Sequence, residues 1–197
     1  MRCSVAVSSV VTSLPLAASA LILETGLGNP DTISAALASF TGPPHRLEHV
    51  GTWNDVSWYN DSKATTPHAA LAAIKSFDRL VLIAGGYDKG VDLSSMASHV
   101  DGIDAVIAIG DTARGVATAF CSVATVDMVD DLPAAVERAL ELAAPGATVL
   151  LSPGCASFDQ YSGFEARGDH FRSLVLDRFA APPTTSTNTP TNHGGIR

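Results

Sequence analysis

The chain has 197 residues, of which 46% are apolar, enough to bury one hydrophobic core. Asp and Glu outnumber Lys and Arg by 20 to 12, which gives a formal net charge of -8 at pH 7. This acidic balance, without any two adjacent Lys or Arg residues, argues against a nucleic-acid-binding or anionic-membrane-binding surface. No run of about 20 apolar residues predicts a transmembrane helix.

The cysteines and the first residues bear on the cellular compartment. Cys3, Cys121 and Cys155 are odd in number and widely spaced, with no CxxC pair, so we expect reduced thiols in a cytoplasmic protein. Arg2 and the mostly apolar residues 5–18 resemble a secretory signal. The hydroxyl residues within this stretch, and the apolar residues that follow it, favour a helix of an upstream domain instead.

Two short helices and a hairpin are predicted in the first 60 residues. The helices are expected at residues 14–24 and 33–40, with Asp31 as the N-cap of the second. A Gly-Pro-Pro breaker then precedes strands at residues 47–53 and 56–59. Asn and Asp at positions 54 and 55 form a two-residue turn of the kind that joins the strands of a β-hairpin.

Strands and helices alternate in the remaining chain. Strands are expected at residues 80–84, 105–109, 123–126 and 148–151, and helices from residue 67 and at 93–100, 112–120, 132–144 and 164–179. This order predicts a Rossmann-like α/β fold: a mostly parallel sheet with helices on both faces, preceded by the β-hairpin. Ligands of such sheets bind at the carboxyl ends of the strands. Residues 182–197 lack periodicity and are predicted to be a disordered tail.

The first loop that could carry chemistry is Asn-Asp-Ser-Lys-Ala-Thr-Thr-Pro at residues 60–67. Pro67 suits the first position of a helix, and Thr66 suits its N-cap. A helix N-terminus beside Lys63 and two hydroxyl groups can bind an anion. The alternative is a capped turn in which the charges of Asp61 and Lys63 are simply solvated.

The second loop, Gly-Gly-Tyr-Asp-Lys-Gly at residues 85–90, follows a predicted strand. Its two leading glycines would let the backbone approach a ligand closely, and Lys89 could reach over the sheet edge. It is no Walker phosphate loop, because Val91 and Asp92 stand where Lys and Ser or Thr are required. Residues 110–115 fail in the same way. The alternative is an ordinary glycine turn with an exposed lysine.

The third loop, Ser-Pro-Gly-Cys-Ala-Ser-Phe-Asp-Gln-Tyr at residues 152–161, follows the last predicted strand. Ser157 near Asp159 suggests nucleophilic chemistry, but no comparable loop holds a His and no nucleophile elbow is present. Hydroxyls and backbone amides at the start of a helix would suit a carboxylate instead. Cys155 is interpreted as a buried small side chain. The six histidines show no metal-ligand spacing.

Together these motifs resemble the C-terminal domain of the MurD-type Mur ligases. The matching segments, at residues 40–48, 60–65, 85–90 and 151–168, agree with that family in order and spacing over about residues 40–180. The run Leu-Ser-Pro-Gly-Cys-Ala-Ser-Phe-Asp-Gln-Tyr, with Phe-Glu-Ala-Arg-Gly after it, is the most specific. The Asp-Asn-Pro-Arg signature of the diaminopimelate-adding ligases is absent.

The resemblance implies an ATP-dependent acid–amino-acid ligase of peptidoglycan synthesis that works through an acyl phosphate. It implies ATP and Mg²⁺ as cofactors, with Arg46 and Asp61 helping to hold the nucleotide. It also implies D-glutamate and UDP-N-acetylmuramoyl-L-alanine as substrates. The residues that it places around D-glutamate are Lys63, Thr65, Lys89, Ser157, Phe158 and Phe164.

The resemblance also predicts a domain division. Residues 1–44 would be a helical remnant of the ATP-binding central domain, residues 45–181 the Mur ligase C-terminal domain, and residues 182–197 the tail. Because the phosphate loop and Mg²⁺ ligands of the family are missing, no catalytic set is complete and no metal site is predicted. We therefore expect no turnover from this chain alone.

Four interpretations follow from the sequence. The first is a fragment of the D-glutamate ligase, with the missing domains supplied by a separate chain. The second is a stand-alone, non-catalytic module that binds an amino acid or a nucleotide. The third is an inert remnant, and the fourth is a fragment of another Mur-type or folylpolyglutamate-type ligase.

Overall fold

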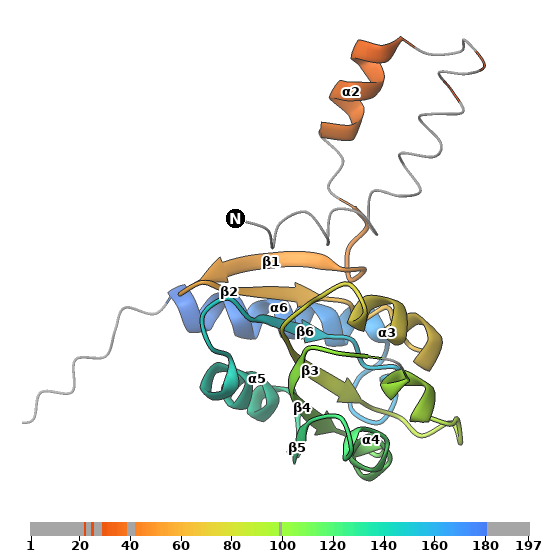
Figure 1. The fold of residues 1–197 in the computed structure, drawn as a ribbon, viewed down its shortest axis with the longest axis vertical. Coiled ribbons are helices and arrows are strands. Elements are labelled where there is room, and N and C mark those ends of the chain that lie inside the picture. The colour runs from red at the N-terminus through yellow and green to blue at the C-terminus, as the bar shows by residue number, and fades with distance from the viewer. Residues whose placement is uncertain (1–21, 23–24, 26–28, 39–41, 99, 181–197) are drawn as a thin grey trace, which may run out of the picture.

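A computed structural model describes residues 22, 25, 29–38, 42–98 and 100–180 of the chain (Figure 1). The predicted helix at 14–24, apart from residue 22, and the predicted tail at 182–197 lie outside these residues. The second predicted helix is α2 (Pro30–Ala38), which begins earlier than expected. The prediction of Asp31 as its N-cap is wrong, because Asn29 Oδ1 accepts a 2.8 Å hydrogen bond from the Asp31 backbone N.

A six-stranded sheet forms the centre of the fold, in the order β1-β2-β6-β3-β4-β5. Strands β1 (Glu48–Trp53) and β2 (Val56–Asn60) are antiparallel, and the two turn residues between them both have positive φ, 52° and 61°. The remaining pairings are parallel and involve β3 (Leu80–Gly85), β4 (Ile103–Ile109), β5 (Thr125–Met128) and β6 (Thr148–Leu151). The predicted hairpin and mostly parallel sheet are confirmed.

Helices cover both faces of the sheet (Figure 1). One face packs against α3 (Pro67–Ile74), the 3₁₀ helix η1 (Ser94–Ala97) and α4 (Ala113–Phe120), and the other against α5 (Leu132–Leu142) and α6 (Phe164–Ala180). Alternation along β3 shows why two cores form: Leu82 points into the first, and Val81 and Ile83 point into the second. Because it is buried on both sides, β3 is apolar throughout.

Local capping explains where two of the helices begin. Thr66 Oγ1 accepts a 3.4 Å hydrogen bond from Ala69 N, and Pro67 occupies the first helical position of α3, as predicted. Asp131 caps α5 by accepting a 2.9 Å hydrogen bond from Ala134 N. Both helices therefore start at the residues that the sequence indicates.

Two further differences from the prediction have local causes. The helix expected at 93–100 contains only η1, because Asp92 accepts hydrogen bonds from both the backbone N and the Oγ of Ser94. Such local side-chain bonds compete with α-helix formation. Strand β5 begins later than predicted, because the chain continues to turn after α4, with Val123 N and Ala124 N both donating to Phe120 O.

The strand order determines where a site can form. Strand β3 leads to η1 on one face, whereas its neighbour β6 leads to α6 on the other. Loops that leave neighbouring strands toward opposite faces open a crevice at the carboxyl edge of a parallel sheet. Among the described residues, no helix has the length and apolarity needed to cross a membrane.

Candidate functional site

The three loops singled out from the sequence lie side by side at the carboxyl edge of the sheet. We refer to them as the β2 loop (61–66), the β3 loop (86–93) and the β6 loop (152–163). Gly154 N, in the β6 loop, donates a 2.9 Å hydrogen bond to Ala64 O in the β2 loop. Tyr87 N, in the β3 loop, donates a 2.9 Å bond to Ala156 O. The β6 loop is therefore bonded to both of the others.

Glycine permits the close approach of the β3 and β6 loops. Gly86 has a φ of 147°, and a Cβ at this position would lie 2.3 Å from Ala156 O. Gly85 has a φ of 113°, and a Cβ there would lie 2.2 Å from Ile109 O. Neither position accepts an L side chain without a backbone shift. Beyond them the loop turns outward and exposes Lys89.

The six residues that the resemblance places around D-glutamate all lie on these loops or at the start of α6. Lys63 Nζ lies 5.6 Å from the centroid of the Phe164 ring. Phe158 is 64% exposed and meets Tyr87 of the β3 loop edge-on, with centroids 6.4 Å apart. Thr65 is half-buried and Ser157 is buried. The structure thus brings Lys63 and Phe164 into direct contact, with the others on adjoining loops.

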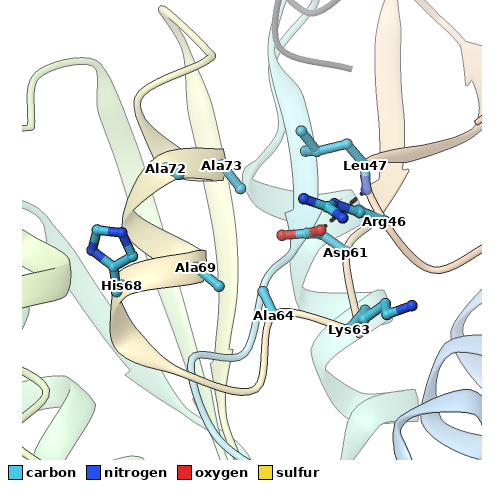
Figure 2. Close-up of a pocket in the computed structure, with 9 residues that line it drawn as sticks. All are labelled: Arg46, Leu47, Asp61, Lys63, Ala64, His68, Ala69, Ala72 and Ala73. Atoms are coloured by element: carbon cyan, nitrogen blue, oxygen red, sulfur yellow. Dashed lines mark hydrogen bonds between the residues drawn. The ribbon is translucent and has the colours of Figure 1, made fainter. Parts of the chain in front are cut away.

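A cleft of about 460 Å³ opens beside the β2 loop (Figure 2). Arg46, Asp61, Lys63 and His68 contribute its polar groups, and apolar side chains form its wall: Leu47, Ala64, Ala69, Ala72 and Ala73. The two residues singled out for ATP therefore line one cleft. The Arg46 guanidinium lies beside the Asp61 carboxylate, whereas the Lys63 side chain points away from that carboxylate (Figure 2).

Asp61 is a buried carboxyl group at the base of this cleft, only 4% exposed. Its Oδ1 accepts a 3.1 Å hydrogen bond from Leu47 N, and its Oδ2 accepts a 2.8 Å bond from Ser152 Oγ. Burial raises the pKa of Asp61 to about 6, against the opposing effects of those two bonds and of Arg46. At pH 7 the group is still mostly ionised, so the cleft contains a buried acceptor.

The backbone around Arg46 is a fixed bend. His45 and Leu47, on either side of it, have positive φ values of 60° and 47°. This conformation costs such residues about 1–2 kcal/mol each. Asn60 Nδ2 donates a 3.1 Å hydrogen bond to His45 Nδ1, and Asp61 binds Leu47 N, so both bends are held from the β2 side. Arg46 itself is exposed.

The buried polar residues without a role predicted from the sequence include Asn60, Ser62 and Arg167. Asn60 Nδ2 also donates to Gly168 O at 3.1 Å, and Arg167 Nε donates to Ser62 Oγ at 2.9 Å. One signal was available for Arg167. It shares a helix face with Phe171, which lies four residues further along and one turn away, and this spacing to an apolar residue indicates burial.

Two alternative chemistries find no support in this geometry. Cys155 is 2% exposed, its Sγ lies 3.4 Å from Thr112 Oγ1, and burial raises the pKa of its thiol. It is the buried small side chain that was predicted, and not an activated thiolate. Within the described part of the chain, no group of three or more His, Cys, Asp or Glu side chains could hold a metal ion.

Comparison with known proteins gives the family. A family model described as "Mur ligase, glutamate ligase domain" matches residues 45–155, more than half of the chain. The chain belongs to the Mur ligase family.

Curated relatives of this Mur ligase domain share the name UDP-N-acetylmuramoylalanine--D-glutamate ligase. The chain is 45% identical to that of Myxococcus xanthus over 160 residues, 80% of this chain and 35% of the relative. It is 44% identical to that of Tropheryma whipplei (strain Twist) over 174 residues, 87% of this chain and 35% of the relative. It is 40% identical to that of Aquifex aeolicus over 161 residues, which make up 80% of this chain and 39% of the relative. The chain therefore spans about a third of the length of these relatives.

Solved structures share the fold of this Mur ligase domain at low sequence identity. UDP-N-acetylmuramate-alanine ligase MurC from Thermotoga maritima matches with a TM-score of 0.57 and 18% identity, over 84% of this chain and 36% of that one. FolC of E. coli in complex with ADP matches with a TM-score of 0.55 and 20% identity, over 78% of this chain and 36% of that one. At these identities the likeness establishes the fold.

Proposed function

We propose that this Mur ligase domain is the D-glutamate-binding part of an ATP-dependent ligase, which joins D-glutamate to UDP-N-acetylmuramoyl-L-alanine in peptidoglycan synthesis. The observation that carries the proposal is the meeting of the β2, β3 and β6 loops at one sheet edge, with Lys63 and Lys89 on two of them. The shared name of relatives at 40–45% identity supports D-glutamate over the substrates of other Mur-type or folylpolyglutamate-type ligases.

The proposed amino-acid site suits a dianion. D-glutamate has two carboxylates that need cations and hydrogen-bond donors, and an amine that must stay unprotonated and unobstructed to attack. The site consists of two cations, two hydroxyls and two aromatic rings: Lys63, Lys89, Thr65, Ser157, Phe158 and Phe164. In a protein of net charge -8, such a cationic cluster is the local exception that an acidic substrate requires.

We also propose that the cleft beside the β2 loop holds part of the ATP molecule. Its residues fit a nucleotide: Arg46 is an exposed cation for phosphate oxygens, Asp61 is a buried acceptor, and the alanines of α3 offer a flat apolar wall. Bound ATP supplies the phosphoryl group that activates the acceptor carboxylate. Mg²⁺ would accompany the phosphates, and the described residues offer it no ligand cluster.

The proposed domain division and location rest on the resemblance. Residues 45–181 would form this domain, residues 1–44 the end of an ATP-binding domain, and residues 182–197 a tail; α2 stands apart from the sheet (Figure 1). The proposed nucleotide substrate and the expected reduced state of the cysteines favour the cytoplasm. Because none of the 197 residues form a Gly-x-x-x-x-Gly-Lys-Ser/Thr pattern, turnover needs a phosphate-binding part from outside them.

A complementation assay tests the proposal. The chain is co-expressed with a polypeptide that carries the uridine-nucleotide and ATP-binding domains of a relative, and phosphate release is measured. We expect release only when both polypeptides, UDP-N-acetylmuramoyl-L-alanine and D-glutamate are present. A rate no higher than that of either polypeptide alone contradicts a ligase function. D-glutamate binding without such a rate would instead favour the stand-alone binding module.

A further inference from the structure

We propose that Arg167 is a positioning residue for the amino-acid site, acting together with Ser62; the inference rests on the D-glutamate site proposed above. Arg167 is 1% exposed. Two of its hydrogen bonds go to the β2 loop. Its Nε donates to Ser62 Oγ at 2.9 Å, and its Nη2 donates to Ser62 O at 2.9 Å. Both atoms belong to the residue that immediately precedes Lys63.

The same guanidinium reaches the other two loops. In the β6 loop, Nη2 donates to Cys155 O at 3.1 Å and Nη1 donates to Ala156 O at 3.2 Å. On the β3 side, a Cβ built on Gly86 would lie 3.1 Å from Nη1, so this group packs against the glycine itself. One side chain therefore contacts all three loops, at residues that directly precede Lys63 in the β2 loop and Ser157 in the β6 loop.

Ser62 connects the hydrogen bonds of Arg167, which we call the Arg167 clamp, to the start of α6. Its hydroxyl accepts the bond from Arg167 Nε and donates a 2.8 Å hydrogen bond to Phe164 O. Lys63 and Phe164 contact each other, and the hydrogen bonds of Ser62 and Arg167 hold the backbone to which both side chains are attached. A serine hydroxyl can do this because it donates and accepts at the same time.

The positive charge of Arg167 also supports a role at an anion-binding site. Buried arginines are normally paired with a carboxylate, but no salt bridge within the described residues includes Arg167. Burial lowers its pKa to about 10, opposed by the more distant charge of Asp159, so the guanidinium stays ionised at neutral pH. Its partners are neutral oxygens, which leaves positive potential beneath the loops, where a dianionic ligand would bind.

Lysine cannot replace this residue. The four hydrogen bonds leave from three different nitrogens of a planar fork, whereas an ammonium presents its donors from one point. Arg167→Lys keeps the charge and loses the geometry. Ser62→Ala keeps the charge and removes only the hydroxyl bridge to α6. The two substitutions together separate positioning from charge.

The experiment compares the 197-residue chain with Arg167→Lys, Ser62→Ala and the matched control Val175→Ala. Val175 is fully buried on the same helix, about two turns beyond Arg167, and packs in the core away from the loops. D-glutamate binding is measured by calorimetry at a temperature where circular dichroism shows all four proteins folded. Amide hydrogen exchange is followed by mass spectrometry in the three loops and in strands β3 and β4.

We expect Arg167→Lys to weaken D-glutamate binding by roughly 100-fold and Ser62→Ala by about 10-fold, with no change in Val175→Ala. Exchange should accelerate in the three loops of Arg167→Lys while β3 and β4 stay protected. Equal binding by Arg167→Lys and the unsubstituted chain, or an equal loss in Val175→Ala, overturns the inference. If the unsubstituted chain does not bind D-glutamate, the proposed function fails, and loop exchange alone decides: no acceleration in Arg167→Lys refutes the clamp.

Discussion

The hydroxyl of Ser152 donates a 2.8 Å hydrogen bond to Oδ2 of Asp61 and so joins the carboxyl ends of the neighbouring strands β6 and β2. Asp61 lines the proposed nucleotide cleft, and Ser152 opens the β6 loop of the proposed amino-acid site. The two candidate sites therefore share a buried polar contact at the sheet edge. The free-energy cost of burying the Asp61 carboxylate can be measured, because its pKa of about 6 lies in a range of pH where the protein can be studied.

Asp61→Asn should stabilise the protein at pH 7.5 more than at pH 4.5. Burial raises the pKa of Asp61 from 3.8 to about 6, so the folded state favours the protonated acid. The associated stability is present below pH 4 and is lost as the pH rises through 6. Asparagine is neutral throughout, and the difference in unfolding free energy between variant and unsubstituted protein should grow by about 2 kcal/mol between the two pH values. Urea unfolding at both measures it, and a difference independent of pH contradicts the burial of this charge.

Gly86→Ala should destabilise the protein far more than Gly90→Ala. A Cβ at Gly86 meets Ala156 O at 2.3 Å, whereas at Gly90 it meets no atom within 4 Å, although both have positive φ. We expect losses of about 3 kcal/mol at Gly86, from clash and strain, and about 1 kcal/mol at Gly90, from strain alone. Urea unfolding compares the two. Equal losses would show that the β3 and β6 loops are not in contact.

Asp55→Gly should stabilise the hairpin by about 0.5–1 kcal/mol, because Asp55 has a φ of 61° that glycine adopts without strain. The 2.7 Å hydrogen bond from Gly146 N to Asp55 O involves only backbone and would be kept. Thr52→Gly, within β1, provides the opposite control and should cost about 1 kcal/mol. Thermal unfolding of both variants gives the sign, and a destabilised Asp55→Gly would count against the assigned turn.

Alkylation should distinguish two of the cysteines. Cys121 is exposed, whereas Cys155 is buried and has a raised pKa. Because the thiolate is the reactive species, Cys155 in the native protein should react with iodoacetamide at least about 100-fold more slowly than Cys121. In urea the two rates should converge. Site-resolved mass spectrometry measures both, and comparable native rates would show that the β6 loop is open.

The sequence predicted the features that depend on neighbouring residues. The Asn54–Asp55 turn needs two residues that tolerate positive φ, and the caps at Thr66 and Asp131 act on amides within three residues. The glycine loops and hydroxyl residues of the candidate site could be found in the same way, since each loop directly follows a predicted strand.

What the sequence did not predict depends on distant contacts. Arg167 Nε and Ser62 Oγ belong to residues 105 positions apart, so no local pattern pairs them. A charged residue on a helix is ordinarily interpreted as solvated, which hid its burial. The helix expected at 93–100 failed for a local reason, because apolar periodicity was given more weight than the competing hydrogen bonds between Asp92 and Ser94.

Calorimetric titration of the 197-residue chain with D-glutamate and with L-glutamate is a direct test of the proposed amino-acid site, because it needs no other domain. We expect binding of D-glutamate in preference to L-glutamate, loss of that binding in Lys89→Ala, and no change in Lys75→Ala, which removes another exposed lysine at the far end of α3. Equal binding of both enantiomers, or D-glutamate binding that survives in Lys89→Ala, would contradict a D-glutamate site at the meeting of the three loops.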